Sequence, residues 1–279
     1  MKKLLLAASL LILTPQTRAV EIVVGRTHLA IPAPAGFAPV TSQMKAYSDV
    51  ADRFVPPTNV QFAEFISNAD ASLAASGGVP ESQRNFTVQT SKQMIQSLVS
   101  TADFDELKST IKNQNAEMLK QAEAQVPGWL DKVSKGISDD YNVDANLSLT
   151  QVLPLPPHVE TARSLAFSMI VKFQTNDADG KAVPFVGVVT TTFVHVQGKI
   201  LFLYANAEKT GLQWSRTESQ KWAEMVVAAN PSAGDVAVRE TSERSSGFDW
   251  GEVGKKALIG AVFGGIIGLF RLIFNKKKG

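Results

Sequence analysis

The stretch "SLAFSMIVKFQ", residues 164–174, decides the fold because its large hydrophobic side chains recur at every second position. These side chains are Leu165, Phe167, Met169, Val171 and Phe173. A period of two is the repeat of a β-strand, whose successive side chains point to opposite faces of a sheet. The stretch therefore predicts a strand with one face in a hydrophobic core.

Two more strands follow this one along the chain. Residues 177–180, Asp-Ala-Asp-Gly, have the composition of a turn, and residues 183–196 read as a strand again. Gln197-Gly198 is a second turn, after which "KILFLYAN", residues 199–206, forms the third strand. Such short connections predict an antiparallel meander of three strands.

Two segments have the helical period instead. Between 104 and 137, hydrophobic residues recur at steps of three or four, which predicts an amphipathic helix, kinked or split at Pro127. Residues 214–229 place Trp214, Trp222 and Val226 on one side of a second helix that can cover the sheet. Because the strands are bunched and the helices set apart, we expect an α+β fold, an antiparallel sheet flanked by helices in the manner of an α/β/α sandwich.

The first half of the chain has shorter elements. Residues 21–40 predict one or two short strands and a Pro/Gly turn, and "QMKAYSDVADRF", residues 43–54, predicts a short helix. Residues 59–67 predict a further strand. The stretch 68–85 contains Gly77, Gly78 and Pro80 and is expected to be a loop.

Three stretches together resemble the PsbP-like α/β/α sandwich. They are "LAIPAPAGFAPV" at 29–40, "VHVQGKILFLYAN" at 194–206 and "ESQKWAEMVVAANPS" at 218–232. In that family an early strand leads into a Pro-Gly-Phe turn, and the chain finishes with a hairpin and a helix. The resemblance covers about half of residues 20–230 and implies a binding, assembly or accessory protein, with no particular activity.

Both ends of the chain predict export and membrane attachment. Residues 1–19 combine Lys2-Lys3, an apolar run and Thr17-Arg18-Ala19, the layout of a signal peptide cleaved after Ala19. Residues 255–274 predict a transmembrane helix, and Lys276 to Lys278 in the tail 275–279 place that tail in the cytoplasm. An exported domain, 20–230, would be joined to the helix by a polar linker, 231–254. This organisation predicts a single-pass protein of the bacterial inner membrane with its domain in the periplasm.

The late hydrophobic segment, "ALIGAVFGGIIGLFRLIFNKKKG" at 257–279, is rich in glycine. Glycine in a water-exposed helix costs about 1 kcal/mol relative to alanine, whereas small residues let membrane helices approach closely. We expect two ridges to form a helix–helix interface: Gly260, Gly264 and Gly268, and beside them Ala257, Ala261 and Gly265. The alternative is a buried or interfacial helix of the globular domain.

The charge of the chain argues against nucleic acid as a partner. The net charge is +2, but 9 of the 28 Lys and Arg residues lie in 1–19 and 251–279. Residues 20–250 hold 19 basic and 25 acidic residues, a net charge of about −6. The chain has no cysteine, so an exported domain without disulfides must be held by its hydrophobic core.

No residue pattern identifies a catalytic, cofactor or metal site. Two S-x-x-K strings, Ser42 to Lys45 and Ser109 to Lys112, and Lys209-Thr210-Gly211 match motifs of penicillin-recognising enzymes but lack their arrangement. Asp140, Asn142 and Asp144 begin an EF-hand pattern that fails at Ala145 and Gln151. His28, His158 and His195 have no metal-ligand spacing, and His195 is expected to be a hydrogen-bonded strand residue. Trp214 and Trp222 are expected to pack on the sheet.

These patterns favour a non-enzymatic binding, adaptor or accessory protein held by a membrane anchor. Its partners would be the lipid bilayer, a protein at the exported domain, and a second copy through the C-terminal helix. Two alternatives stay open. One is a periplasmic, hydrolase-like enzyme whose site forms only in three dimensions, for instance around His195 or Tyr204. The other is an oligomeric membrane element that works through the glycine-rich helix.

Overall fold

The computed structural model describes residues 19–80, 82–141, 146–176, 181–231, 259–262 and 264–265. Its main element is an eight-stranded sheet in the order β3-β4-β5-β10-β9-β8-β6, with β7 paired to β8 and every described pair antiparallel. The strands are β3 (Phe37–Pro39), β4 (Asn59–Ser67), β5 (Arg84–Ser91), β6 (Leu147–Pro154), β7 (Val159–Glu160), β8 (Ser164–Asn176), β9 (Ala182–Val196) and β10 (Lys199–Glu208). A separate hairpin consists of β1 (Ala19–Val24) and β2 (Thr27–Pro32).

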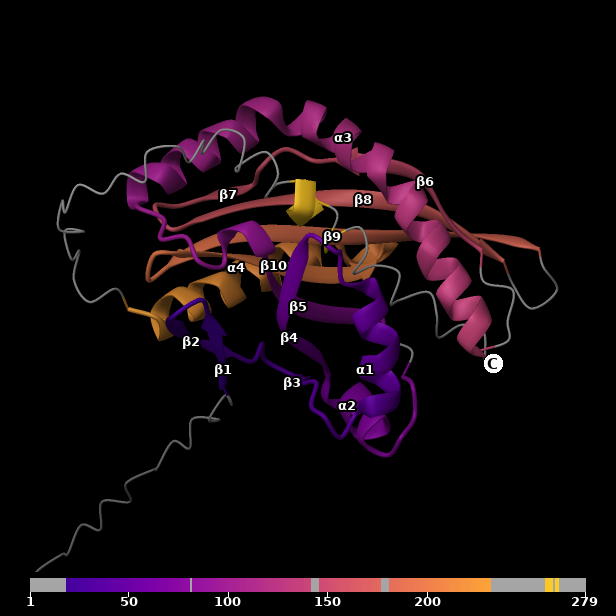
Figure 1. The fold of residues 1–279 in the computed structure, drawn as a ribbon. Helices are drawn as coiled ribbons and strands as arrows, with labels where there is room; N and C mark the ends of the chain where they lie inside the picture. The colour runs from indigo at the N-terminus through magenta and orange to yellow at the C-terminus, as the bar shows by residue number, and fades with distance from the viewer. Residues whose placement is uncertain are drawn as a thin grey trace, which may run out of the picture.

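Helices lie on both sides of this sheet (Figure 1). The helix α3 (Thr101–Tyr141) arches over one face, and α4 (Leu212–Ala229) packs with the β1–β2 hairpin on the other. Two short helices, α1 (Lys45–Ala51) and α2 (Asn68–Ala75), pack beside β3 and β4. The predicted α+β class, with an antiparallel sheet flanked by helices, is therefore confirmed.

The meander predicted from residues 164–206 is present as β8, β9 and β10. The β9–β10 turn places Gln197 and Gly198 at φ 47° and 73°, the left-handed conformation that a tight two-residue hairpin requires. The turn predicted at 177–180 lies outside the described residues. The odd-numbered residues of β8 from Leu165 to Phe173 join the core beneath α3.

The structure corrects the prediction for residues 68–85. The helix α2 occupies the first eight residues of the expected loop, and β5 begins at Arg84. The hydroxyl of Ser67 caps α2 by accepting a hydrogen bond from the Asp70 backbone at 3.1 Å, and an alanine-rich sequence follows. Of the two alternatives predicted at Pro127, a kink or a split, the split is wrong, because α3 continues through that residue as one helix of 41 residues.

Most of the predicted membrane segment lies outside the described residues. Among those described, no helix combines the length and the hydrophobicity needed to cross a membrane. Residues 259–262 and 264–265 are described, are helical, and lie between α3 and the sheet (Figure 1, yellow). We call these six residues the C-terminal segment. The predicted signal peptide, the rest of the linker and the basic tail, residues 1–18, 232–258 and 266–279, are outside the description.

Candidate functional site

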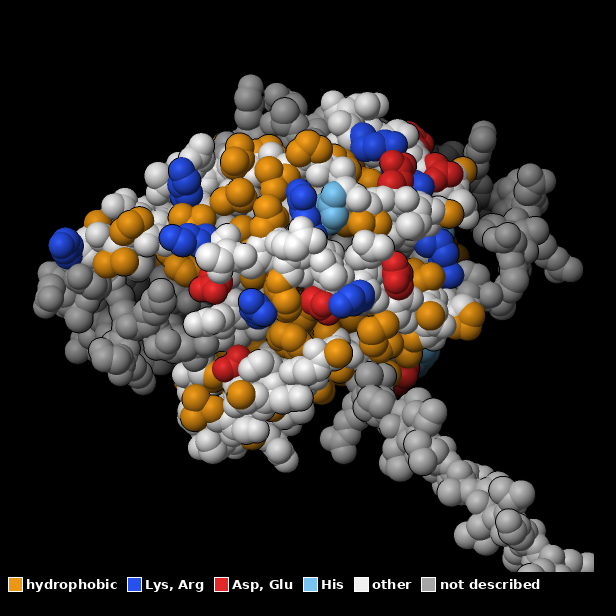
Figure 2. Space-filling view, turned by 180° about the vertical axis from the view of Figure 1, so that it is seen from behind, with side chains coloured by type: hydrophobic (Ala, Val, Ile, Leu, Met, Phe, Trp, Pro, Cys, Tyr) orange, Lys and Arg blue, Asp and Glu red, His pale blue; other side chains and the backbone are white. Residues whose placement is uncertain are grey.

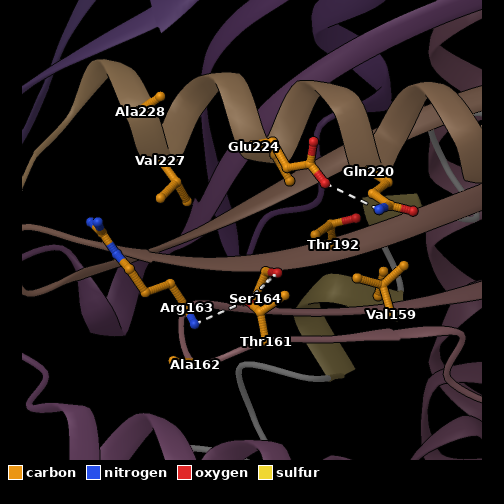
Figure 3. Close-up of a pocket in the computed structure, with 12 residues that line it drawn as sticks. Val159, Thr161, Ala162, Arg163, Ser164, Thr192, Gln220, Glu224, Val227 and Ala228 are labelled. Carbon is orange, nitrogen blue, oxygen red and sulfur yellow. Dashed lines mark hydrogen bonds between the residues drawn. The ribbon is translucent and has the colours of Figure 1, made fainter.

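A surface pocket of about 400 Å³ opens between α4 and the start of β8, but its polar groups are already engaged (Figure 3). Arg163 donates from Nε to the His195 carbonyl at 3.1 Å and from Nη2 to the Asn230 carbonyl at 3.2 Å. Gln220 donates to the carboxylate of Glu224 at 3.1 Å. The remaining lining is largely Ala and Val, so the pocket has no set of side chains arranged for acid–base or nucleophilic chemistry.

The histidines do not gather at a site in the described part of the chain. His195 forms the hydrogen bond expected of a strand residue, from Nε2 to the Val99 carbonyl at 2.8 Å, and stacks on Phe104. Burial lowers its pKa. Burial, together with the charge of Arg216, lowers the pKa of His158 to about 4, and neither of its ring nitrogens has a hydrogen-bond partner. The described residues contain no group of metal-ligating side chains.

The enzyme-like strings behave as ordinary structural elements. Lys209–Gly211 is a single 3-10 turn that leads into α4. Lys112 forms an ion pair with Glu160 at 3.0 Å. Asp140 is near the end of α3, while Asn142 and Asp144 lie outside the described residues. Trp222 packs on Phe65 and Phe86, as expected, and donates to the Pro32 carbonyl at 2.8 Å.

His195 and Tyr204 lie on the same sheet face without forming one site. His195 pairs with Ile200 and Thr191 pairs with Tyr204, so the two side chains are four residues apart along paired strands. At about 3.3 Å per residue this separation is roughly 13 Å. A hydrogen bond between them is therefore impossible in this arrangement.

The most distinctive contact of the molecule is that between the C-terminal segment and the sheet. Ala261 and Val262 are fully buried, and Gly260, Gly264 and Gly265 are buried with them. A Cβ atom added at Gly264 would lie 2.6 Å from Tyr204 Oη and 2.8 Å from Gln89 Oε1. One added at Gly260 would lie 2.7 Å from Asn59 Oδ1. A larger residue at either position would force Asn59, Gln89 or Tyr204 to shift the end of its side chain.

Polar side chains on this part of the sheet hold the segment through its backbone. Asn59 Nδ2 donates to the Gly260 carbonyl at 2.9 Å and also to Gln89 Oε1 at 2.9 Å. Gln89 Nε2 donates in turn to Gln61 Oε1 at 3.2 Å. The chain of hydrogen bonds continues through Gln61 to Glu64, which also accepts from Tyr47 Oη at 2.7 Å. These side chains are buried or partly buried, so the contact is a built polar network.

Seven polar side chains on one face of β4, β5, β9 and β10 form what we call the polar floor: Asn59, Asn85, Thr87, Gln89, Thr191, Tyr204 and Asn206. The C-terminal segment approaches four of them, Asn59, Gln89, Thr191 and Tyr204. All seven are buried. Burial raises the pKa of Tyr204 well above its ordinary value of 10, so its phenol keeps its proton.

The predicted helix–helix interface is only partly described. Gly260, Gly264, Gly265 and Ala261 all face the domain's own interior, whereas Ala257 and Gly268 lie outside the described residues. The small-residue ridges were predicted to contact another helix, and self-association through them stays a prediction. The polar floor was missed. Its sequence signal is the alternation of Asn85, Thr87 and Gln89 with hydrophobic residues in β5.

Charge is dispersed over the face opposite the view of Figure 1. Figure 2 shows basic and acidic side chains interspersed among hydrophobic ones there. No continuous basic stripe is visible on that face, outside the grey atoms.

Comparison with protein-family models and with curated proteins found no match. Solved structures with a distant similarity include cyanobacterial PsbP from Synechocystis, with 9% sequence identity over 72% of this chain and 84% of that one, at a TM-score of 0.23. Another is the Ran-binding protein Mog1p of Saccharomyces cerevisiae, with 9% identity over 77% of this chain and 93% of that one, also at 0.23. The predicted resemblance to the PsbP-like fold is thus confirmed as a distant structural similarity, which carries no information on function.

Proposed function

We propose that the protein is a non-enzymatic binding protein, exported and tethered to the inner membrane, whose polar floor receives a small-residue helix. The helix that it receives in this chain is its own C-terminal segment. The observation that carries the proposal is the contact at Gly260 and Gly264, where added Cβ atoms would approach sheet side chains to 2.7 and 2.6 Å. A surface that approaches a helix so closely at two positions one helical turn apart favours small residues there.

The same residues are proposed to serve in two places. A helix over 257–274 that spans a bilayer removes Gly260 to Gly265 from the floor, so floor and bilayer are alternative environments for one segment. Both remove its apolar side chains, such as Val262, from water. We infer that the segment exchanges between them and that the polar linker, 231–254, permits this exchange.

The hydrolase-like alternative is less well supported. The two side chains suggested for it lie roughly 13 Å apart along paired strands. His195 is held by the Val99 carbonyl, and its partner helix α3 stacks Phe104 on its ring.

The oligomeric alternative shares an element with our proposal. Self-association through Gly260 and Gly264 needs the helix face that the floor occupies in this structure. Docking on the floor and docking on a second helix therefore compete. A helix of similar composition from another protein would compete with the C-terminal segment for the polar floor in the same way.

Engineered cysteines test whether the segment occupies the floor. The chain has no native cysteine, and a Cβ at Gly260 would lie 3.7 Å from Asn59 Cγ, close to where the sulfur of a cysteine at 59 would lie, so a cysteine pair at these positions is within reach of a disulfide. We expect Asn59→Cys with Gly260→Cys to form an intramolecular disulfide on mild oxidation, seen as faster migration in non-reducing electrophoresis. Neither single variant should do so. Absence of the disulfide from the double variant would refute docking on the floor.

A matched pair of glycine substitutions sharpens this test. Gly264→Val, added to the cysteine pair, should lower the disulfide yield at least tenfold because its side chain overlaps Tyr204 and Gln89. Gly128→Ala should leave the yield unchanged, since a Cβ there meets nothing within 4 Å. Equal yields for the two variants would show that the floor does not select glycine.

Membrane attachment is tested separately by carbonate extraction. We expect the intact protein to remain with the membrane fraction, because the bilayer holds the hydrophobic segment in the attached state. Full release of the intact protein would contradict the tether while leaving the floor contact untouched.

A further inference from the structure

The pocket between α4 and the start of β8 contains a cation that no acidic side chain neutralises. The guanidinium of Arg163 bonds two backbone carbonyls, from Nε to His195 and from Nη2 to Asn230. Among the described residues no carboxylate forms an ion pair with Arg163, and its Nη1 makes no hydrogen bond. Nη1 is not one of the buried atoms that lack a partner, so it is open to solvent. Arg163 thus presents a fixed positive charge with free N–H donors.

The rest of the pocket is mainly apolar, because its hydroxyl groups bond to their neighbours. Ser164 Oγ is hydrogen-bonded to Thr161 Oγ1 at 2.8 Å, and Thr192 Oγ1 to Ser219 Oγ at 2.6 Å. The volume of about 400 Å³ is within the range of small-molecule sites. Small side chains form the remaining walls: Val159, Ala162, Ala166, Ala223, Val227 and Ala228.

The sheet and α4 arrange these groups along one groove (Figure 3). Ala166 of β8 pairs with Val159 of β7 on one side and with Thr192 of β9 on the other, so three strands contribute to the floor. Arg163 and Val159 lie towards opposite ends of the pocket. A ligand that lies along the floor therefore brings one of its ends to the arginine.

The charges around the groove favour an anion. The one carboxylate of the lining, Glu224, is exposed, accepts a hydrogen bond from Gln220 at 3.1 Å and forms no ion pair with Arg163. A second cation, Arg216, precedes Gln220 by four residues on the same side of α4 and donates from Nε to Ser168 Oγ at 3.1 Å. Two arginines thus face a single exposed glutamate.

We propose that this pocket binds a small amphipathic carboxylate, such as a fatty acid of short or medium chain length. The alkyl chain lies on the alanine and valine walls, and the carboxylate accepts hydrogen bonds from Arg163 Nη1. Burial of the chain supplies the affinity, at about fourfold per CH₂ group, and the arginine fixes the direction of the ligand. The site shares no residue with the polar floor and is independent of the docking of the C-terminal segment.

The test uses full-length protein in nanodiscs of neutral lipid, labelled with ¹³C at its alanine methyl groups. The probes are octanoate, hexanoate and the uncharged octanamide. We expect octanoate to shift the methyl signals of Ala166 and Ala223, and to leave that of Ala75, exposed on α2, unchanged. Hexanoate should bind about tenfold more weakly because it lacks two CH₂ groups, and octanamide at least fivefold more weakly because it lacks the charge. Octanamide binding as tightly as octanoate, or no shift with octanoate, would refute the site.

Substitutions separate the charge from the walls. Arg163→Gln should weaken octanoate binding about tenfold and leave octanamide binding unchanged, whereas Lys221→Gln, which removes a cation of α4 outside the pocket, should change neither. Ala166→Leu should abolish binding of both probes by filling the floor, and Ala75→Leu should not. Because Arg163 also bonds two carbonyls, urea unfolding checks that its variant is folded. If Arg163→Gln fails to fold, the comparison of octanoate with octanamide decides. Octanoate binding that survives Ala166→Leu, or a folded Arg163→Gln, contradicts the proposal.

Discussion

The helix α4 and the C-terminal segment cover opposite faces of the same strands, and they treat the polar groups beneath them differently. On the α4 face, Thr190 and Thr192 of β9 are hydrogen-bonded to Ser215 and Ser219 of α4, at 2.7 and 2.6 Å. On the other face Thr191, which lies between them, has no partner. One cover matches the sheet and the other does not.

The match on the α4 face has a geometric basis. Residues four apart on a helix are separated by about 6 Å along its axis, and residues two apart on a strand by about 6.7 Å. Ser215 and Ser219 can therefore stand over Thr190 and Thr192 in register. Ser215 also donates to the Ala205 carbonyl at 2.7 Å. Gly260 and Gly264 have the same spacing but bring no hydrogen-bonding side chain, which is what a removable cover requires.

The largest effect that we predict concerns α4, which we expect to stay packed on its face of the sheet. Trp222→Ala should lower the free energy of unfolding by about 3–5 kcal/mol, because a fully buried indole leaves a cavity among Phe65 and Phe86. Urea unfolding measures the loss. Lys221→Ala, an exposed neighbour on α4, should change it by less than about 0.5 kcal/mol. A loss below 1 kcal/mol for Trp222→Ala would show that α4 is not a fixed part of the core.

The next effect is smaller and tests the hydrogen bonds of the same face. Thr192→Val keeps the shape of the side chain but leaves the Ser219 hydroxyl buried without its partner. The free energy of unfolding should fall by about 1–3 kcal/mol. Adding Ser219→Ala should recover part of the loss, because the stranded hydroxyl is then removed as well. A double variant that is as unstable as the sum of the two single variants would contradict this coupling.

Sequence periodicity predicted the parts of the fold in which hydrophobic spacing is regular. The alternation from Leu165 to Phe173 predicted β8, and the helical spacing from Phe104 onward predicted α3. The helix α2 was not predicted, because Gly77 and Gly78 made the whole stretch 68–85 resemble a loop. The helix signals, the Ser67 cap and the alanines, stand before those glycines. Pro127 sits inside α3 because packing on the sheet outweighs a local helix breaker.

The polar floor could not have been predicted in the same way. Asn85, Thr87 and Gln89 alternate with Phe86 and Val88, which is also the pattern of a strand with one face in water. In the structure β5 pairs with β10, more than 110 residues later, and the C-terminal segment contacts Gln89 on that face. Single-sequence periodicity contains neither contact.

Acid should weaken the α4 face selectively. The pKa of His158 is lowered from 6.5 to about 4, mainly by burial, so its neutral form is favoured in the folded protein. The stability that this contributes is present above about pH 6.5 and is lost as pH falls towards 4. Unfolding measured from pH 7.5 to 4 should show a shallower decline for His158→Gln than for the wild-type chain. We place this effect below that of Thr192→Val because the ring is only half-buried and solvent screens its charge.

The phenol of Tyr204 makes a useful contrast in that experiment. Its raised pKa keeps it neutral throughout this range, so the floor should not respond to acid through this residue. Disulfide formation itself slows in acid because the thiolate is the reacting form, so the yield of the Asn59→Cys, Gly260→Cys protein is taken relative to an exposed dithiol oxidised alongside it. This relative yield should be equal at pH 7.5 and pH 5, and a strong fall at pH 5 would place a titrating group at the floor.

The smallest effect that we predict decides the comparison, because it concerns the residue next to Thr192 on the opposite face. Thr191→Val removes a buried hydroxyl that has no partner, so the folded state loses a desolvation penalty and no hydrogen bond. The free energy of unfolding should stay the same or rise by up to about 1 kcal/mol, in contrast to the fall for Thr192→Val. Two isosteric substitutions at adjacent positions of β9 would then change the free energy of unfolding in opposite directions. This is expected if α4 pairs the hydroxyls beneath it and the C-terminal segment does not. If Thr191→Val destabilises the protein as much as Thr192→Val does, Thr191 is paired in solution, and the floor beneath the C-terminal segment is as complete as the surface beneath α4.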